Sequence, residues 1–576
     1  MCGIFSLLNN NVLSESFIKE QFIKGVGRGP ESSTLKNIST HTLFGFHRLA
    51  INGLNSVSDQ PIQIGNVSII CNGEIYNYKE LYQLLNITPT TQSDCEVIIH
   101  LYNQFGIEYT LQMLDGVFAF VLFDGDYHKD EYKLYIARDP YGIRPLYSCV
   151  SENMIYGFAS ELKMLSKITS NVRHFAPGTY SEFVYSLKVH SKWILQCENR
   201  RYHVTGFSEM LTYNQFAENR TLQRNDFFDI VKNIQKYLKT AVYKRCCCTE
   251  RPIACLLSGG LDSSLITALV CEYHKKNKLP QVETYSIGLS GSEDLKHARI
   301  VADHLGTKHT EIIVTEQEFV DAIPEVIYAI ESYDTTTVRA SIGNYLLGKY
   351  ISKHSDAKVI FNGDGSDELM GGYLYMHAAP NAIEFDKETR RLLSDIYMFD
   401  VLRSDKSIST HGLEPRTPFL DRAWTQYYLS IPPQYRYKPG LLGFYPHYRY
   451  IEKFLVRLAF SKEYYSETEL LPEKILWRTK EAFSDGVSSQ QKSLFTIIQE
   501  AIDKIPIQYI VGQYKHNSPI TKEQIYYRDL FEKYYTGIGN VIPYFWMPKY
   551  LNATDPSART LQVYYECNPE LNERAV

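Results

Sequence analysis

The chain has 576 residues, of which 44% are hydrophobic and 22% are charged, and its formal net charge is −5. This length suggests two to four domains, and the composition is ordinary for a soluble globular enzyme. The net negative charge argues against nucleic acid as a partner, and the 11 cysteines form no CxxC pair that would indicate a zinc site.

The first residues do not have the features of a targeting signal. Segment 1–12 lacks a basic start and a long apolar core, and no stretch of the chain approaches a membrane span. The run Cys246–Cys248 is too tight for metal ligands and is typical of reduced thiols. We therefore expect a cytoplasmic protein that does not contact a membrane.

Residues 2–200 are predicted to form one domain that consists mostly of strands. Short runs rich in Val, Ile, Phe and Tyr alternate there with turns rich in Gly, Asn and Asp. One helix is predicted among them, from about Asp94 to Phe105, with Ser93 as its cap. This pattern indicates an α+β fold built from antiparallel sheets.

The pattern changes after residue 200. Residues 201–225 are polar without clear periodicity and are predicted to be a linker. Residues 226–380 alternate apolar strands with long helical patterns, which is typical of an α/β doubly wound parallel sheet. Beyond 380 the chain is predicted to be helical, so the second domain, 226–576, carries a helical C-terminal extension.

Cys2 directly follows the initiator methionine. If Met1 is removed, Cys2 carries both a thiol and a free α-amine, and an amine with an ordinary pKa near 8 can take the thiol proton. A cysteine at position 2 has no meaning alone, but further blocks follow in order. They are RLAI at 48–51, CNGEIYN at 71–77, SDCEVI at 93–98, RDPYGIRPLY at 138–147 and FASELKML at 158–165.

Together these blocks resemble the class II glutamine amidotransferase domain, which has an N-terminal-nucleophile fold. The resemblance implies that Cys2 attacks the carboxamide of glutamine, while Asn72 and the backbone N–H of Gly73 form the oxyanion hole. The implied glutamine-binding residues are Arg48, Leu49, Ala50, Ile51, Asn52, Asn72, Gly73, Glu74 and Asp94.

Within that set, the resemblance assigns separate roles to the charged residues. Arg48 would hold the substrate α-carboxylate, to which a guanidinium is geometrically suited. Glu74 and Asp94 would hold the α-ammonium. The family often has His-Arg-Gly-Pro-Asp where this chain has Gly27–Glu31, a minor departure because Arg-Gly-Pro is kept.

The segment SGGLDSS at 258–264 is the most specific signal in the second domain. An apolar strand leads into the Ser-Gly-Gly turn, and a helix is predicted to begin at about Leu261. Glycines let the backbone approach a phosphate, and the helix N-terminus offers free N–H groups to it. The segment is not a Walker A loop, because it lacks the GK[ST] ending.

This segment resembles the pyrophosphate loop of N-type ATP pyrophosphatases, which cut ATP into AMP and pyrophosphate. The resemblance implies ATP and Mg²⁺ as cofactors, with Asp262 and Asp367 as metal ligands. Leu256 and Ile287 are expected to flank the adenine and the ribose. The implied ATP-binding residues are Leu256, Ser258, Gly259, Gly260, Asp262, Ser263, Ile287, Asn362, Gly363 and Lys480.

The combination of both halves resembles the asparagine synthetase family, and this resemblance covers nearly the whole chain. The blocks that carry it are 291–309, 330–341, 363–380, 411–421, 471–487 and 546–561. It implies that ammonia from glutamine is joined to aspartate through a β-aspartyl-AMP intermediate, with glutamate, AMP and pyrophosphate as products. A homodimer is expected from the resemblance alone.

The resemblance also names residues for aspartate and the intermediate. Arg339 and Lys480 are expected to provide positive charge around the phosphates. Asp400 and Arg403, with Tyr373 nearby, are candidates for binding aspartate. An aspartate and an arginine three positions apart share one face of a helix, and on spacing alone a surface ion pair is an equal alternative.

One departure from the family concerns a catalytic candidate. The family typically has Ser-Gly-Glu where this chain has Asn362-Gly363-Asp364. The glutamate is associated with forming or consuming the intermediate, and aspartate is shorter by one methylene group. Because a proton-transfer group must lie within about 2.6–3.2 Å of its target, we expect a reduced synthetase rate.

Three alternatives remain at this point. A phosphoribosyl or hexosamine amidotransferase would match the first domain but would lack SGGLDSS. A β-lactam synthetase would share the second domain, but its nucleophile and NGE blocks would be eroded. A non-catalytic or impaired regulatory homologue on the same scaffold is favoured only by Asp364 and Asn362.

Overall fold

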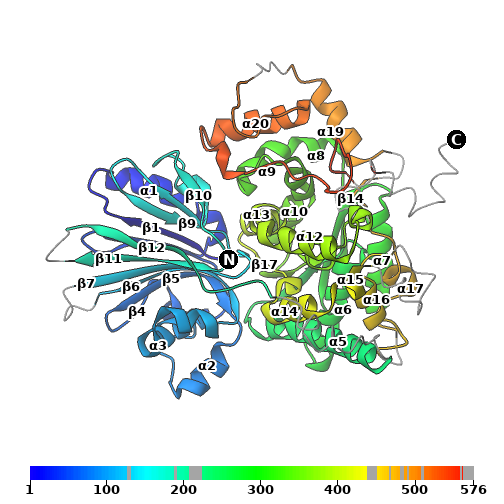
Figure 1. Ribbon diagram of the computed structural model, residues 1–576, viewed down its shortest axis with the longest axis horizontal. Coiled ribbons are helices and arrows are strands. Elements are labelled where there is room, and N and C mark those ends of the chain that lie inside the picture. Colours follow the sequence, from blue (N-terminus) through cyan, green and yellow to red (C-terminus); the bar gives the residue numbers. More distant parts are fainter. Residues whose placement is uncertain are drawn as a thin grey trace.

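Alternating apolar residues bring the strands of the first half together as two facing sheets. The computed structural model describes residues 1–125, 131–186, 191–206, 224–437, 451–465, 469–480, 486–488, 492–506, 512–557 and 561. In Figure 1 the N-terminal domain lies on the left, and the helix-rich second domain lies on the right. The first residue lies between them, at the junction of the two domains (Figure 1).

Both sheets of the N-terminal domain are antiparallel and contain six strands each within the described residues. The first has the order β10-β8-β9-β1-β3-β2 and the second β12-β11-β7-β6-β5-β4. The strands of the first sheet are β1 (Gly3–Leu8), β2 (Ser32–Ser39), β3 (Thr42–Arg48), β8 (Tyr147–Val150), β9 (Tyr156–Ala159) and β10 (Val172–His174). Those of the second are β4 (Ile62–Ile64), β5 (Val67–Ile75), β6 (Gly116–Asp124), β7 (Glu131–Arg138), β11 (Thr179–Ser186) and β12 (Trp193–Arg201).

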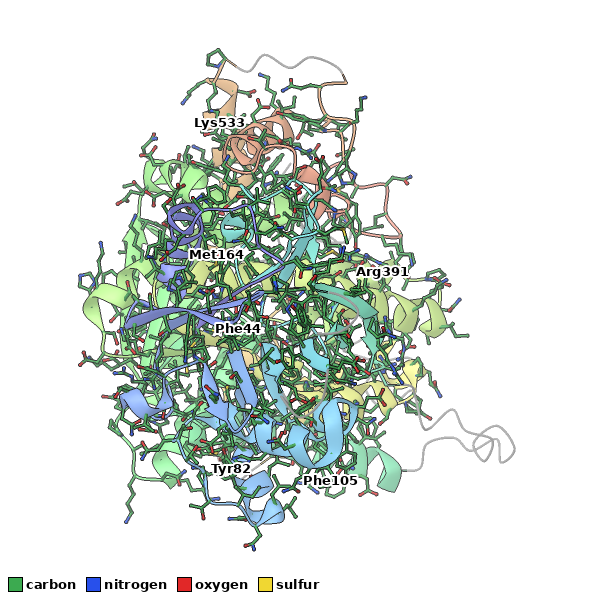
Figure 2. The ribbon with its side chains drawn as sticks, turned by 90° about the vertical axis from the view of Figure 1, so that its left-hand side faces the viewer. Phe44, Tyr82, Phe105, Met164, Arg391 and Lys533 are labelled. Carbon is green, nitrogen blue, oxygen red and sulfur yellow. The ribbon has the colours of Figure 1, made fainter. Side chains whose placement is uncertain are left out.

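The central strands of the second sheet bury both faces. Side chains of a strand alternate between its faces, so Ile70 packs against Ile4 and Phe44 of the first sheet, while Ile69 and Cys71 pack toward the helices. Viewed from this domain, Phe44 lies near the middle of the molecule, and helices carry Tyr82 and Phe105 along its lower edge (Figure 2). The predicted sandwich of antiparallel sheets is confirmed.

The helix prediction for this domain was incomplete. Among the described residues there are three α-helices, α1 (Glu15–Ile23), α2 (Tyr78–Leu85) and α3 (Val97–Met113), where one was predicted. Ser93 caps a short 3₁₀ helix, Asp94–Glu96, that leads into α3, and its side chain accepts from the N–H of Cys95. The predicted end at about Phe105 coincides with a break inside α3, where the non-helical Gly106, with φ of 74°, separates two helical stretches.

The second domain contains a parallel sheet of the order β15-β14-β13-β16-β17 among the described residues. Its strands are β13 (Ile253–Leu256), β14 (Glu283–Leu289), β15 (Lys308–Val314), β16 (Val359–Phe361) and β17 (Glu414–Arg416). Ile253 and Cys255 pack toward α5 and α6, whereas Ala254 and Leu256 pack toward α10. Helices therefore cover both faces, as the doubly wound prediction requires.

Most of the second domain is helical, as predicted. Its α-helices are α5 (Arg224–Cys247), α6 (Leu261–Lys276), α7 (Glu293–Leu305), α8 (Glu316–Asp321), α9 (Ile323–Ile330), α10 (Thr335–His354), α11 (Ser366–Met370), α12 (Ala382–Asp395), α13 (Asp400–Ser409), α14 (Arg422–Ser430), α15 (Pro433–Tyr437), α16 (Phe454–Ala459), α17 (Glu473–Leu476), α19 (Leu494–Asp503) and α20 (Lys522–Tyr534). The predicted linker 201–225 falls largely outside the described residues. In the described part of the chain, no helix combines the length and apolar character needed to cross a membrane.

Buried ion pairs join the two domains along α13. The Arg28 guanidinium lies 2.8 Å from Asp405 of α13 and 2.7 Å from Glu161 of its own domain. The Lys406 ammonium lies 3.1 Å from Glu161 and 2.5 Å from Glu331. Because all five side chains are almost fully buried, removing one member would leave an uncompensated charge.

Candidate active sites

Cys2 lies directly before β1, at the junction of the domains. Its thiol is 3.6 Å from the carbonyl oxygen of Leu49, and its own carbonyl accepts a hydrogen bond of 2.9 Å from Arg28. Burial raises the pKa of the Cys2 thiol to about 11, against an opposing effect of the neighbouring terminal ammonium. The amino group of Met1 is buried 3.8 Å from Glu414, and burial lowers its pKa to about 6.

The predicted oxyanion residues lie on β5, next to the start of β1. The hydroxyl of Ser160 accepts from the backbone N–H of Ile4 at 3.0 Å and from the amide of Asn72 at 3.5 Å. Ser160 therefore links the nucleophile's strand to the oxyanion strand. A Cβ at Gly73 would lie 2.4 Å from the carbonyl oxygen of Val117, so only glycine fits there.

Arg48 ends β3 and holds the loop that follows it, residues 49–53, which we call the glutamine loop. Its guanidinium donates to the carbonyl oxygen of Asn55 at 2.8 Å, to Asp59 at 2.5 Å and to the carbonyl oxygen of Gly53. The guanidinium is thus engaged within the protein. Its expected contact with a substrate carboxylate remains a proposal.

Two buried carboxylates lie beside the glutamine loop. Glu74 accepts from the amide of Asn52 at 2.7 Å, and Asp94 accepts from the backbone N–H of Ile75 at 2.6 Å. Burial raises the pKa of Asp94 to about 6. Burial and the neighbouring Asp94 also raise the pKa of Glu74, although Arg416 lies 3.5 Å from it. The pair therefore strongly favours a bound cation such as an ammonium group.

The second site is a cavity of about 200 Å³ at the carboxyl ends of the parallel strands. Cys255 of β13 pairs with Phe361 of β16, so Leu256 and Asn362 leave the sheet side by side. Ligands bind at this position in open α/β sheets, where neighbouring strands connect in opposite directions. Of the sequence candidates, the cavity is lined by Leu256, Ser258, Asp262, Ser263, Ile287, Asn362, Gly363, Asp364, Asp367, Tyr373, Asp400, Arg403 and Lys480.

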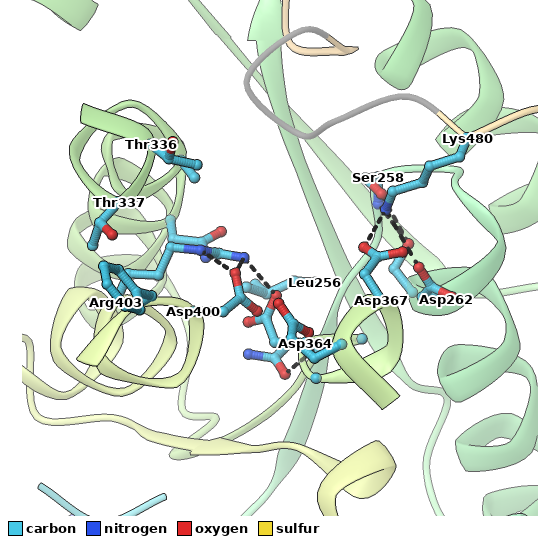
Figure 3. A pocket seen from close by; sticks show the side chains of 18 of the residues that line it. Leu256, Ser258, Asp262, Thr336, Thr337, Asp364, Asp367, Asp400, Arg403 and Lys480 are labelled. Atoms are coloured by element: carbon cyan, nitrogen blue, oxygen red, sulfur yellow. Dashed lines mark hydrogen bonds and ion pairs between the residues drawn. The ribbon is translucent and has the colours of Figure 1, made fainter. Parts of the chain in front are cut away.

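Opposite charges meet at one end of this cavity. Asp367 lies 2.7 Å from the Lys480 ammonium, and Asp262 lies 3.5 Å from it, as Figure 3 shows. Lys453 lies 2.6 Å from Asp262 and 2.5 Å from Asp367, with almost no exposure of its side chain. Despite burial, the two lysines hold the pKa of Asp367 well below its usual range, so this carboxylate is ionised at neutral pH.

These two carboxylates fit the expected Mg²⁺ by their chemistry. Asp262 and Asp367 both contact the single ammonium of Lys453, so they converge on one cationic position. Among the described residues, no group of three or more His, Cys, Asp or Glu side chains could hold a metal. Mg²⁺ is typically held by one or two carboxylates together with phosphate oxygens, and its binding by Asp262 and Asp367 remains a proposal.

An aspartate–arginine pair occupies the other end of the cavity. The Arg403 guanidinium donates to Asp400 at 2.7 Å and to Asp364 at 3.2 Å (Figure 3). Burial raises the pKa of Asp400 to about 6, with a further contribution from Asp364 and against the effect of Arg403. The second oxygen of Asp364 has no hydrogen-bond partner among the described residues. This end therefore offers both charges that an amino acid requires.

Three sequence candidates of the second domain, Gly259, Gly260 and Arg339, are not among the described residues that line the cavity. Gly260 lines a second pocket that shares Ser258, Asp262 and Lys480 with the cavity. Gly259 lies behind the cavity with φ of 75°, where a Cβ would lie 2.4 Å from the backbone of Ala298. Arg339 is 3% exposed and donates to Glu523 at 2.8 Å and to Asp555 at 2.8 Å. Its charge is paired with these two carboxylates, and its expected role around the phosphates remains a prediction.

The structure adds residues that the sequence motifs did not single out. Lys453 stands beside Lys480 as the second cation, although its surroundings in the sequence carry no motif. Glu368 lines the cavity and accepts from the hydroxyl of Tyr373. Thr336 and Thr337 line the wall opposite the strands. Both threonines lie in the block IESYDTTTVRAS, which was a usable signal.

Comparison with known proteins gives two family matches and close relatives. A family described as a glutamine amidotransferase domain matches residues 1–195, and one described as asparagine synthase matches residues 233–387 and 378–539. The chain is 42% identical over 582 residues to the asparagine synthetase [glutamine-hydrolyzing] of Gallus gallus, covering 98% of this chain and 99% of that protein. It is 40% identical over 583 residues to the protein of the same name from Homo sapiens, with the same coverage.

Proposed function

The chain belongs to the asparagine synthetase family. We propose that glutamine is hydrolysed at Cys2 and that asparagine is made in the cavity at the carboxyl end of β13. The activity of the chain is that of a ligase that uses ATP. The separate positions of the two sites support the assignment of one reaction to each. The nucleophile lies at the domain junction, and the cavity combines two carboxylates, two lysines and an aspartate–arginine pair.

The first reaction frees ammonia from glutamine. After removal of Met1, the α-amine of Cys2 takes the thiol proton, and the thiolate attacks the carboxamide carbon. Asn72 and the N–H of Gly73 stabilise the oxyanion that develops on the carbonyl oxygen. Ammonia leaves with that proton, and water hydrolyses the glutamyl thioester to glutamate. Glu74 and Asp94 hold the substrate ammonium, and Arg48 orients its carboxylate.

The second reaction joins this ammonia to aspartate. The side-chain carboxylate of aspartate attacks the α-phosphorus of ATP and displaces pyrophosphate, which gives β-aspartyl-AMP. Ammonia then attacks the acyl carbon and displaces AMP. Asp400 and Arg403 hold the aspartate, and Lys480 and Lys453 stabilise charge on the departing pyrophosphate.

Asp262 and Asp367 would hold Mg²⁺, which when bound neutralises charge on the phosphate oxygens. Leu256 and Ile287 flank the nucleoside. The cytoplasmic location and the homodimer remain predictions, as do the domain boundaries at 2–200 and 226–576.

One experiment tests the division into two sites. Asparagine and pyrophosphate are measured with aspartate, ATP and Mg²⁺, using either glutamine or ammonium, for the wild type and for Cys2→Ala. We expect both nitrogen sources to work in the wild type and only ammonium to work in the variant. Synthesis from glutamine by Cys2→Ala would refute the assignment of the nucleophile.

The same measurement tests the alternative of an impaired regulatory homologue. Asp364 favours that alternative, because its carboxylate is shorter than the glutamate typical of the family and is held by Arg403. A wild type that hydrolyses glutamine but makes no asparagine from either source would support it, and Asp364 would be the first residue to replace.

A further inference from the structure

The glutamine loop is held by residues of the other domain. Residues 248–251, which we call the clamp segment, connect α5 to β13 in the synthetase domain. The backbone N–H of Glu250 donates to the carbonyl oxygen of Ile51 at 3.0 Å, and its carboxylate accepts from the N–H of Gly53 at 2.7 Å. The side chain of Arg251 donates to the carbonyl oxygen of Ala50 at 2.8 Å.

A carboxylate of the N-terminal domain closes this arrangement into a ring. Glu31 accepts from the Arg251 guanidinium at 2.7 Å and from the N–H of Ala50 at 2.8 Å. Both polar groups of the Ala50 backbone are thereby bound to the same pair of side chains. The contacts fall on consecutive peptide groups of the loop rather than on scattered surface side chains.

The clamp segment also reaches the carboxylate that faces the substrate ammonium. The thiol of Cys248 lies 3.8 Å from Glu74 and 3.6 Å from the amide of Asn52. Burial and the neighbouring Glu74 raise the pKa of Cys248, so the group remains a thiol that donates to Glu74. Arg416 lies 3.5 Å from Glu74 and donates to the carbonyl oxygen of Cys248 at 2.8 Å.

The glutamine loop has no helix or strand of its own to fix its shape. A loop without regular structure takes its conformation from the partners of its backbone groups. Here those partners are Glu250 and Arg251 of the synthetase domain together with Arg48 and Glu31 of the loop's own domain.

We propose that Glu250 and Arg251 are positioning residues for glutamine, through which the synthetase domain sets the shape of the glutamine-binding loop in the other domain. This inference rests on the proposed function, because it takes the glutamine loop as the binding site. Neither residue contacts substrate. Both act on the loop that contains Asn52, whose amide donates to Glu74, one of the two carboxylates proposed to hold the substrate ammonium.

The test is the double variant Glu250→Ala/Arg251→Ala in the full-length protein. Loss of the side-chain hydrogen bonds to Gly53 and Ala50 is expected to raise the KM for glutamine about five- to tenfold in the glutaminase reaction. The glutaminase kcat and the ammonium-dependent synthesis of asparagine should stay within about twofold of the wild type. Glu250 is exposed and Arg251 only half-buried, so the fold should tolerate both changes.

Two further variants separate positioning from a general effect of charge or stability. Glu250→Gln keeps the oxygen that accepts from Gly53 and should keep the KM of the wild type. Arg299→Ala/Glu311→Ala also removes one partly exposed arginine and one glutamate of the synthetase domain, but these two pair with each other and should leave the KM for glutamine unchanged.

A KM for glutamine within twofold of the wild type in the double variant would overturn the inference while leaving the proposed function intact. Failure of the proposed function has a different signature, because the wild type would then not hydrolyse glutamine, or Cys2→Ala would still do so.

Discussion

Asp364 and Asn362 are the two cavity residues that differ from the Ser-Gly-Glu expected from the family resemblance. One of the Asp364 oxygens accepts from Arg403 at 3.2 Å, and the other lies in the cavity without a described partner. Glutamate would reach about one methylene further, and a misplacement of about 1 Å can cost on the order of a hundredfold in rate. We therefore predict that Asp364→Glu raises aspartate-dependent pyrophosphate release about tenfold.

The rate of glutamine hydrolysis is the internal control for this variant, because Cys2 belongs to the other domain. It should not change. An unchanged or lower rate of pyrophosphate release would show that the loop already places Asp364 correctly.

The carboxylates of the glutamine site predict a pH dependence. The pKa of Asp94 is raised to about 6 by burial, and that of Glu74 is raised as well. A group with a raised pKa is ionised above that value and becomes neutral as the pH falls through it. We predict that kcat/KM for glutamine falls by up to about tenfold per pH unit below about pH 6, because the substrate ammonium loses its partner.

Replacement of the carboxylate checks this assignment. Asp94→Asn cannot titrate, so its profile should be lower at pH 7.5 and lack the inflection near pH 6. A wild-type value that is flat from pH 5 to 7.5 would exclude the two carboxylates as the ammonium site.

The positions of candidate residues were predictable where a contiguous motif carries them. SGGLDSS and NGDGSDE led to Asp262 and Asp367, which the structure places around one cation. Lys453 was not predictable, because it reaches these carboxylates from a segment without a motif. Arg339 lies within a motif, but its pairing with Glu523 and Asp555 was not predictable, because both partners come from distant parts of the chain.

At the scale of elements, α13 is the connection between the two sites. Its first turn carries Asp400 and Arg403 into the cavity, and its middle carries Asp405 and Lys406 toward the N-terminal domain. Its residues are almost all buried, although many of them are polar or charged. Each charge on it requires a partner from another element.

The Lys406 ammonium on α13 is fully buried between Glu161 and Glu331. We predict that Lys406→Met destabilises the protein by about 3–5 kcal/mol, because Glu161 and Glu331 lose one of the two buried lysines that pair with both, and Lys163, which remains, lies 3.7 Å from Glu331. The shift in the thermal unfolding midpoint measures this effect.

A lysine of an exposed pair is the matched control for that variant. Lys349 lies 3.0 Å from Glu325 with a 44% exposed side chain, and Lys349→Met should cost less than about 1 kcal/mol. Equal effects of the two substitutions would contradict the importance of the buried cluster.

Elements were predictable to the extent that their periodicity is local. Apolar runs separated by turns predicted the antiparallel sheets of the first domain, and apolar strands that alternate with helical patterns predicted the parallel sheet. Helices α1 and α2 were missed, since they are only nine and eight residues long and each directly follows a strong strand signal. The predicted helix end near Phe105 coincides with the break at Gly106, beyond which α3 continues to Met113.

At the scale of the whole molecule, buried polar contacts join the two domains. The interface contains Arg28–Asp405 and Arg144–Glu414 as well as the clamp segment. None of these contacts could be derived from the sequence, because each joins residues more than 170 positions apart. They depend on how two separately predictable domains are packed together.

Loss of the buried Arg28–Asp405 ion pair tests whether the two domains unfold together. The two groups lie 2.8 Å apart, and Arg28 also holds the carbonyl of Cys2. Asp405→Asn keeps the shape but removes the charge, which leaves Arg28 with Glu161 alone. We predict that the wild type unfolds in a single calorimetric transition, that this transition broadens or splits into two in Asp405→Asn, and that glutaminase kcat falls severalfold as Cys2 loses its fixed position.

An exposed aspartate provides the comparison. Asp503 pairs with Lys522 at 2.8 Å with 64% of its side chain exposed, so Asp503→Asn should leave both the transition and the glutaminase rate unchanged. If Asp405→Asn behaves in the same way, the buried pairs do not couple the domains. Apolar packing along the interface would then hold them together instead.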